Sequence, residues 1–168
     1  GGIGSGAHFG GATLMSLSGG KATHIPLKGS VEIPLSLLRG DTDFAFSIAG
    51  TVIPQVKAGK LRALAVTSAT PLKELPGVPT LNEVMKNELT VQEFWFGLWL
   101  PAKSPAEAVN KIYASAIKAL ADPAVKTMFE AGGNTVTQSS SPQADAAFVK
   151  DEYRKWAEII KLTGVTAG

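Results

Sequence analysis

Short apolar runs rich in β-branched and aromatic residues alternate with segments of helical pattern along this chain, and the alternation limits the possible folds more than any other feature. The apolar runs are 22–27, 43–48, 61–66, 93–101 and 134–138, of which 93–101 is either a strand or an extended crossing segment. Apolar strands of this kind are typical of parallel sheets with helices packed on both faces. The sequence therefore predicts an α/β fold of parallel-rich sheets flanked by helices.

Capping residues predict where the helices begin and end. Ser5 and Ser30 are each followed by a helical pattern, and Gly40 is expected to end the second helix. Two stretches, 80–83 and 104–107, have the Ser/Thr-x-x-Glu spacing of a capping box. The expected helices are 6–17, 30–38, 51–58, a two-turn helix from 80, 104–121, a helix from 122 that ends at Gly132–Gly133, and 142–163, with 104–121 and 142–163 the longest.

A proline-rich connector separates two parts of the chain. Pro71, Pro76 and Pro79 lie within 70–80, and the helical segments become longer after residue 100. Proline and turn residues at this density interrupt regular structure. We therefore expect one structural part at 1–92 and a second at 93–168.

The first stretch of the chain is rich in glycine and carries no Lys, Arg, Asp or Glu before Lys21. A glycine-rich turn at a helix start presents backbone N–H groups to an anion, and the helix dipole assists. Phosphate, sulfate and carboxylate all suit this arrangement. Residues 2–7 match the G-x-G-x-x-A fingerprint of dinucleotide-binding folds, which also need an acidic residue about 20 positions later. No acidic residue stands at 22–28, which argues against a dinucleotide site.

Charge and residue content exclude several classes of protein. The formal net charge is +2 and basic residues are interspersed with acidic ones, so nucleic acid is not an expected partner. The chain has no cysteine, and its two histidines lack the spacing of a zinc site. We therefore expect no metal, no cofactor and no catalytic residue.

The histidines and tryptophans allow ordinary structural roles as well as functional ones. His8 falls in the first turn of the first expected helix, where the helix dipole should keep it neutral, free to pack or to form one hydrogen bond. His24 falls in an expected buried strand and is interpreted as a structural histidine. Trp95 and Trp99 lie together in 93–101, where packing in the core is preferred over lining a ligand cleft.

Several segments, in the same order, resemble the Bug-type solute receptors of tripartite tricarboxylate transporters. They are GIGSGAH, HIPLKG, LLRGDTDFAF, IPQVKAGKLRALAVTS, LPGVPTLNE and FWFGLWLPAKSP, which together extend over nearly the whole chain. KAGKLRALAVTS followed by LPGVPT is the most specific. The resemblance implies a periplasmic-binding-protein fold of two α/β lobes with a cleft between them. In that fold 1–92 is the second ligand-binding lobe, and 93–168 is the crossing segment and the C-terminal part of the first lobe.

The resemblance also implies a periplasmic protein that is not an enzyme and that captures a small organic carboxylate, often a dicarboxylate, for the membrane subunits of a transporter. Receptors of this family hold the carboxylate with backbone groups and ordered water on two strand–turn–helix motifs, one of which is G-x-G-S-x-x-H. At the position of Ser47 the family often has Asp, Asn or Gly, so the hydroxyl changes which ligand group is met there. The residues that the resemblance places at the ligand are Gly4, Ser5, Gly6, His8, Ser47 and Ile48.

Receptors of this family are longer than this chain and their first lobe begins upstream of it, so the resemblance implies a fragment that lacks the N-terminal part. The expected helices 104–121 and 142–163 then leave apolar faces uncovered. The expected consequence is self-association through these exposed helix faces, or retention of the upstream polypeptide. An enzyme that binds a phosphorylated cofactor through the glycine-rich loop stands as the alternative function. The side chains expected to be uncovered are Ile112, Ile117, Trp156 and Ile160.

Overall fold

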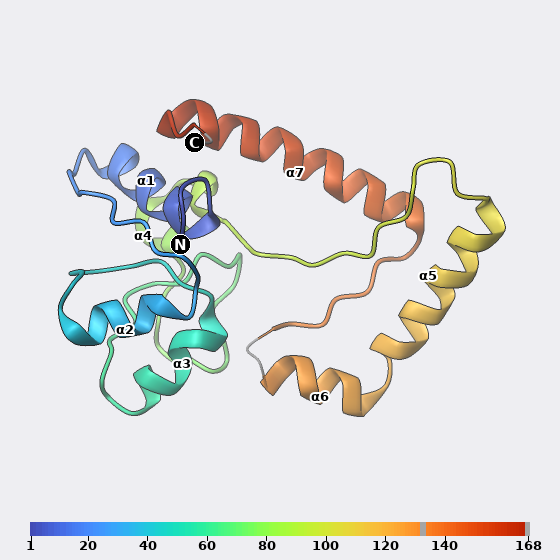
Figure 1. Cartoon of the computed structure of the whole chain (residues 1–168), viewed down its shortest axis with the longest axis horizontal. Helices are drawn as coiled ribbons and strands as arrows, with labels where there is room; N and C mark the ends of the chain where they lie inside the picture. Colours follow the sequence, from blue (N-terminus) through green and yellow to red (C-terminus); the bar gives the residue numbers. More distant parts are fainter. Residues whose placement is uncertain (132–133, 167–168) are drawn as a thin grey trace. The chain divides into compact units, whose positions relative to one another are not determined.

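The computed structural model describes residues 1–131 and 134–166. This part of the chain consists of helices joined by extended segments (Figure 1), and within it no helix is both long and apolar enough to cross a membrane. The chain divides into unit 1 (Gly1–Phe94 and the chain from Lys155 onward) and unit 2 (Trp95–Arg154). The elements are α1 Gly6–Ser18, α2 Glu32–Arg39, α3 Ala49–Lys57, α4 Leu81–Met85, the 3-10 helix η1 Glu88–Thr90, α5 Ala106–Leu120, α6 Pro123–Ala131 and α7 Pro142–Thr163.

Three helix starts expected from the sequence are confirmed. Ser5 is the N-cap of α1, and its side chain accepts a backbone N–H of the first turn. Thr80 and Glu83 form a complete capping box at the start of α4. Ser141 Oγ accepts the Ala144 N–H at 3.1 Å where α7 begins. These side chains satisfy donors that a helix leaves free at its N-terminus, and α5 and α7 are the longest described helices, as expected.

Two helices begin elsewhere than expected. α2 has Val31 rather than Ser30 as its N-cap, because tight turns with i→i+3 hydrogen bonds already bend the chain just before it. α3 starts before Thr51, because the Thr51 N–H bonds to the Ile48 carbonyl (3.0 Å) and closes the first turn there. α2 ends as expected at Gly40, whose φ of 77° suits glycine.

The capping box expected at the start of α5 is not formed. Pro105 is the N-cap residue and offers no side-chain acceptor, while the Ser104 N–H bonds back to the Pro101 carbonyl (3.0 Å). Ser104 therefore belongs to the preceding turn. α6 begins as expected, with Asp122 accepting a backbone N–H at 2.8 Å, and its expected end at Gly132–Gly133 lies outside the described residues.

The described residues do not form the parallel-rich sheet that the sequence predicts. None of the five apolar runs has a β-ladder there, and the strand pairing among these residues is one isolated parallel bridge between Val66 and Thr80. A strand is defined by neighbours that satisfy its backbone N–H and C=O groups. Each run therefore has the composition of a strand but no partner strand within the described chain.

The bridge is part of a short hydrogen-bonded network inside unit 1. The Val66 N–H bonds to the Pro79 carbonyl (3.0 Å), and the Leu81 N–H bonds to the Val66 carbonyl (2.7 Å). The Gln92 N–H donates to the Thr67 carbonyl (2.9 Å), and Thr67 Oγ1 donates to the Gln92 carbonyl (2.8 Å). Two adjacent residues therefore connect the proline-rich connector with the segment that follows η1.

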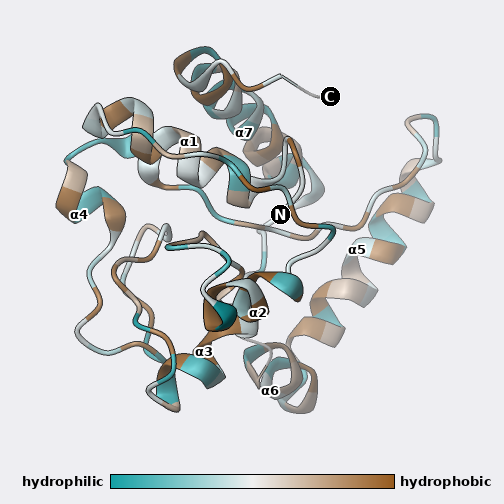
Figure 2. Cartoon of the chain, turned by 60° about the vertical axis from the view of Figure 1, so that its left-hand side comes forward, coloured by the Kyte–Doolittle hydropathy of each residue, from teal (hydrophilic) through white to brown (hydrophobic). Residues whose placement is uncertain are grey.

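Unit 1 contains the hydrophobic core. Its helices α2 and α3 lie side by side (Figures 1 and 2), and Phe9 of α1 packs edge-on against Trp156, with ring centroids 5.4 Å apart. Burial of apolar side chains is the main stabilising contribution in a globular fold. The buried apolar side chains among the described residues are Phe9, Ile33, Ile53, Leu75, Leu81 and Ile159, all of them in unit 1.

The described residues of unit 2 include no buried apolar side chain. The unit contains α5, α6, most of α7 and an extended stretch at 95–100, here called the aromatic segment. Neither α5 nor α6 has a buried residue within the described chain, and hydrophobic residues alternate with hydrophilic ones along α5 (Figure 2). The side chain of Trp95 packs edge-on against Phe148 (5.3 Å between centroids), and its Nε1 donates to Glu152 (3.0 Å). The described contacts of unit 2 therefore join exposed aromatic side chains to each other and to one buried carboxylate, Glu152.

The four apolar side chains expected to be uncovered behave in two ways. Ile112 of α5 and Ile160 of α7 are exposed. Ile117 and Trp156 are half-buried, and Trp156 is covered on one side by Phe9. The expectation therefore holds in full only for the two isoleucines that are exposed.

Candidate functional site

The glycine-rich loop leads directly into α1. Gly4 has a positive φ of 72°, which glycine adopts without strain, and its N–H donates to Nδ1 of His8 (3.2 Å). Ser5 Oγ accepts the His8 N–H (3.3 Å). Among the described residues, the N–H groups of Gly6 and Ala7 have no acceptor. The start of α1 therefore presents two free donors on a loop held closed by Ser5 and His8.

His8 and His24 stack face to face, with ring centroids 3.8 Å apart and planes at 7°. Burial lowers the pKa of His8, and the neighbouring His24 and the α-amino group of Gly1 lower the pKa further. His8 is thus a neutral ring with one hydrogen bond, as expected. The expectation attributed its neutral state to the helix dipole, whereas burial is the largest cause of its lowered pKa. His24 is exposed, so its expected place in a buried strand is wrong, because 22–27 has no partner strand among the described residues.

Two glycines of α1 allow aromatic rings to approach the helix backbone. A Cβ on Gly10 would lie 2.7 Å from the ring of Phe46, and a Cβ on Gly6 would lie 2.5 Å from the ring of Phe94. Close-packed interiors leave no space for atoms at such distances. The Phe46 contact places the segment that leads into the second candidate loop directly against α1, so both loops belong to one packed unit.

The second candidate loop lies at the start of α3. Ile48 is the N-cap of α3, with extended backbone and no side-chain cap. The hydroxyls of Ser47 and Thr51 share a hydrogen bond (2.9 Å), and Thr51 Oγ1 donates to the Ile48 carbonyl (2.7 Å). Within the described chain, the N–H groups of Ala49 and Gly50 have no acceptor. α3 therefore repeats the feature found at α1, a helix start with two free donors.

The charge distribution at both helix starts favours an anion. Neither α1 nor α3 has an acidic residue in its first turn, so the free N–H groups and the positive end of each helix dipole are not neutralised locally. No group of three or more metal-ligating side chains occurs in the part of the chain that the structure describes. The arrangement is suited to binding anionic groups through backbone donors.

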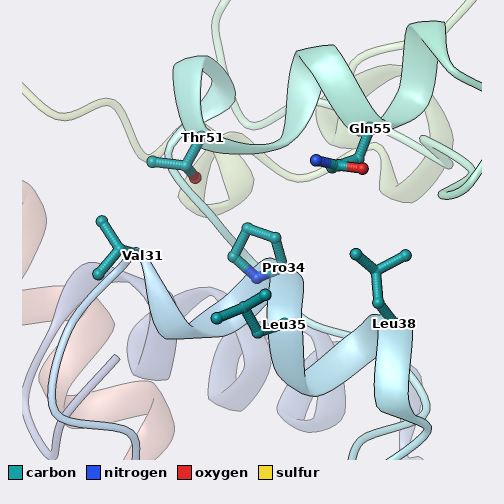
Figure 3. A pocket seen from close by; sticks show the side chains of 6 residues that line it. All are labelled: Val31, Pro34, Leu35, Leu38, Thr51 and Gln55. Carbon is teal, nitrogen blue, oxygen red and sulfur yellow. The ribbon is translucent and has the colours of Figure 1, made fainter.

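A hollow of about 320 Å³ lies between α2 and α3 (Figure 3). Thr51 lines this hollow and shares a hydrogen bond with Ser47, so it connects the hollow with the second candidate loop. None of the six expected ligand residues lines the hollow. The sequence analysis missed Thr51, although hydroxyl residues four positions apart at a helix start signal a local side-chain hydrogen bond. The lining residues are Val31, Pro34, Leu35, Leu38, Thr51 and Gln55.

The two neighbouring tryptophans do not pack in a core. Trp95 is 37% exposed and Trp99 is 68% exposed, with ring centroids 6.1 Å apart. The expectation of core packing is therefore wrong, because the described residues include no second layer over the aromatic segment.

The chain matches the family described as tripartite tricarboxylate transporter family receptor over residues 1–165. It is 28% identical to a protein of the clcB–clcD intergenic region of Pseudomonas knackmussii, over 95% of this chain and 94% of that one. It is also 28% identical to protein BugT of Bordetella pertussis, over 96% of this chain and 49% of that one. The chain thus spans about half the length of BugT and nearly the full length of the Pseudomonas relative.

Solved structures of solute-binding proteins also resemble this chain over about half of their own length. An R. palustris protein solved with adipate superposes with a TM-score of 0.81 at 25% identity, over 97% of this chain and 54% of that chain. A structure described as a periplasmic transporter superposes with a TM-score of 0.80 at 27% identity, over 95% and 53%. The fold is therefore that of the solute-binding receptors, a class of transport proteins rather than enzymes. This chain belongs to the tripartite tricarboxylate transporter receptor family.

Proposed function

We propose that this chain is a ligand-binding lobe of an extracytoplasmic receptor that captures a small organic carboxylate, and in particular a dicarboxylate. The observation that carries the proposal is the pair of helix starts in unit 1, each with two free N–H donors and no acidic residue in its first turn. Family membership supports the same function, with the ligand collected in the periplasm and passed to the membrane subunits of the transporter. In this proposal 1–92 is the second lobe of the receptor, and 93–168 contributes to the first.

At α1 the loop donates to one carboxylate, directly or through water. The N–H groups of Gly6 and Ala7 are free to donate. Ser5 Oγ accepts the His8 N–H, so the hydroxyl hydrogen of Ser5 is available to the ligand. Gly4 and His8 hold the loop in shape through their own hydrogen bond.

At α3 the backbone N–H groups and the Ser47 hydroxyl suit different groups of the ligand. The N–H groups at the start of the helix suit a second carboxylate, and a dicarboxylate, adipate, is the ligand of the R. palustris neighbour. Because Thr51 Oγ1 donates to the Ile48 carbonyl, the hydrogen between Ser47 and Thr51 comes from Ser47. Ser47 Oγ therefore offers only lone pairs, which favour a hydroxyl or other donor on the ligand at that point.

Adipate titration of the ¹⁵N-labelled chain, followed by NMR, tests the proposal. We expect the amide resonances of Gly6, Ala7, Ala49 and Gly50 to shift, with weak affinity because one lobe cannot close on the ligand. A hydrogen bond to a charged group is worth roughly 1.5–3 kcal/mol, so Ser5→Ala should weaken binding about tenfold. Ser16→Ala, at an exposed position on the same helix, is the matched control and should bind like the parent chain.

Nucleotide titration of the same sample tests the alternative function. A phosphorylated cofactor bound at the glycine-rich loop would shift Gly6 and Ala7 with ATP or NAD and leave Ala49 and Gly50 in place. That result, together with no response to adipate, would replace the receptor proposal with the alternative enzyme. No response to any carboxylate would remove both helix starts from the site.

A further inference from the structure

The ring of Phe94, the last residue of unit 1 before the aromatic segment, reaches back to the first candidate loop. A Cβ on Gly6 would lie 2.5 Å from Cζ, 2.7 Å from Cε2 and 3.4 Å from Cε1 of this ring. The ring therefore meets the helix backbone with its tip, and its faces are turned elsewhere. Phe94 is 59% exposed, so more than half of its surface stays open to solvent at the loop.

The ring lies at the end of α1 where an anion would approach. Gly6 is the first residue of α1, and Cα–Cβ bonds in a helix tilt toward its N-terminus. A ring that fills the Cβ position of Gly6 therefore stands beside the helix start. The N–H groups of Gly6 and Ala7, which have no acceptor among the described residues, lie at the same end. The loop thus combines two backbone donors with an aromatic ring beside them.

Hydrogen bonds of Gln92 fix the chain from which Phe94 extends. The Gln92 N–H donates to the Thr67 carbonyl (2.9 Å), and Gln92 Nε2 donates to Thr13 Oγ1 of α1 (2.8 Å). Gln92 and Thr13 are both buried, so this side-chain bond joins α1 to the segment after η1 inside unit 1. The ring of Phe94 therefore extends from backbone that is held relative to α1, which keeps the ring at Gly6.

We propose that Phe94 is a specificity-determining residue of the first candidate loop and selects a carboxylate whose neighbouring carbon atoms carry no polar group. With the carboxylate on the N–H groups of Gly6 and Ala7, the carbons next to it pass the ring and bury apolar surface against it. A hydroxyl on those carbons would lose water at the ring without gaining a hydrogen bond there. The proposal rests on the carboxylate function proposed above and adds the chemistry of the carbon chain.

A matched pair of ligands tests the proposal. Mucate has the same carbon chain and the same two carboxylates as adipate, but it carries a hydroxyl on each of the carbons between them. Both are titrated into the ¹⁵N-labelled chain, and the amide shifts of Gly6 and Ala7 give the affinities. Because burial of one methylene group changes an affinity about fourfold, Phe94→Ala should weaken adipate binding about fourfold or more and leave mucate binding nearly unchanged. Phe94→Leu, which keeps an apolar side chain, should retain most of the adipate affinity.

Phe96→Ala is the matched control, because Phe96 is the same type of residue, is 83% exposed and belongs to unit 2. It should bind both ligands like the parent chain. Equal weakening of adipate and mucate by Phe94→Ala would mean that the ring only supports the loop, and it overturns the proposal, as does an unchanged adipate affinity. Failure of the proposed function is distinguishable, since neither ligand would then shift Gly6 or Ala7 in the parent chain, and the role of Phe94 would be refuted with it.

Discussion

At the scale of single residues, the hydrogen bond from the Gly4 N–H to Nδ1 of His8 makes the glycine-rich loop sensitive to pH. Neutral His8 accepts the Gly4 N–H at Nδ1, and protonation at Nδ1 removes that acceptor. Because burial, and then His24, lower the pKa of His8, the folded chain takes up this proton less readily than the unfolded chain. The stability that neutral His8 contributes is therefore complete above about pH 6.5 and is lost as the pH falls through the lowered pKa.

We expect the ring resonances of His8 to titrate in NMR spectra with a midpoint below the ordinary histidine value of about 6.5. His24→Ala should raise the midpoint only in part, because burial is the larger cause of the lowered pKa. On the acidic side of the midpoint, the Gly4 amide should exchange faster with solvent. A midpoint at or above the ordinary value would contradict the burial of His8 and its contact with His24.

At the scale of elements, Gly10 and Gly11 of α1 differ in the space that they leave for a side chain. A Cβ on Gly10 would lie 2.7 Å from Phe46, whereas a Cβ on Gly11 would meet nothing within 4 Å. Alanine is favoured over glycine in a helix interior by roughly 0.8–1 kcal/mol, so Gly11→Ala should raise the free energy of unfolding by about that amount. Gly10→Ala should lower it by about 1–2 kcal/mol through overpacking. Urea denaturation measures both, and equal stabilisation would mean that Phe46 does not pack on α1.

Helices were predictable here because their signals are local, and strands were not because their partners are distant. Ser5 and Thr80 cap helices as their spacing indicates. Ser104 has the same spacing as Thr80 but makes no cap, because Pro105 shifts the helix start and Ser104 joins the preceding turn. The run 61–66 has strand composition, yet its pairing depends on segments that no local pattern identifies.

At the scale of the whole molecule, the two units differ in what stabilises them. Every buried apolar side chain within the described residues belongs to unit 1. Segments with few buried apolar contacts open at low free energy. In the 168-residue chain alone, amides of α5 should therefore exchange with solvent about tenfold or more faster than amides of α1, although α5 is the longer helix. Equal protection in a hydrogen-exchange experiment would show that unit 2 has a stable core of its own.

The first candidate loop could be predicted from the sequence, but most of the residues that surround it could not. Ser5 and Gly6 can be proposed as site residues from the sequence because a glycine-rich turn before a helix is a local pattern and resembles a known motif. Thr51 was missed, and the burial of Trp99 was misjudged, because both depend on which segments pack nearby. The structure also groups the end of α7 with the first part of the chain, a return of the chain that no short stretch of sequence specifies.

The tryptophans give each unit an optical signal of its own. Of the three in the chain, Trp156 packs against Phe9 in unit 1, while Trp95 and Trp99 belong to unit 2. With Trp156 replaced by phenylalanine, all tryptophan emission arises from unit 2, and with the other two replaced it arises from unit 1. The intrinsic fluorescence of two simple variants can therefore follow the assembly of each unit separately, without any added dye.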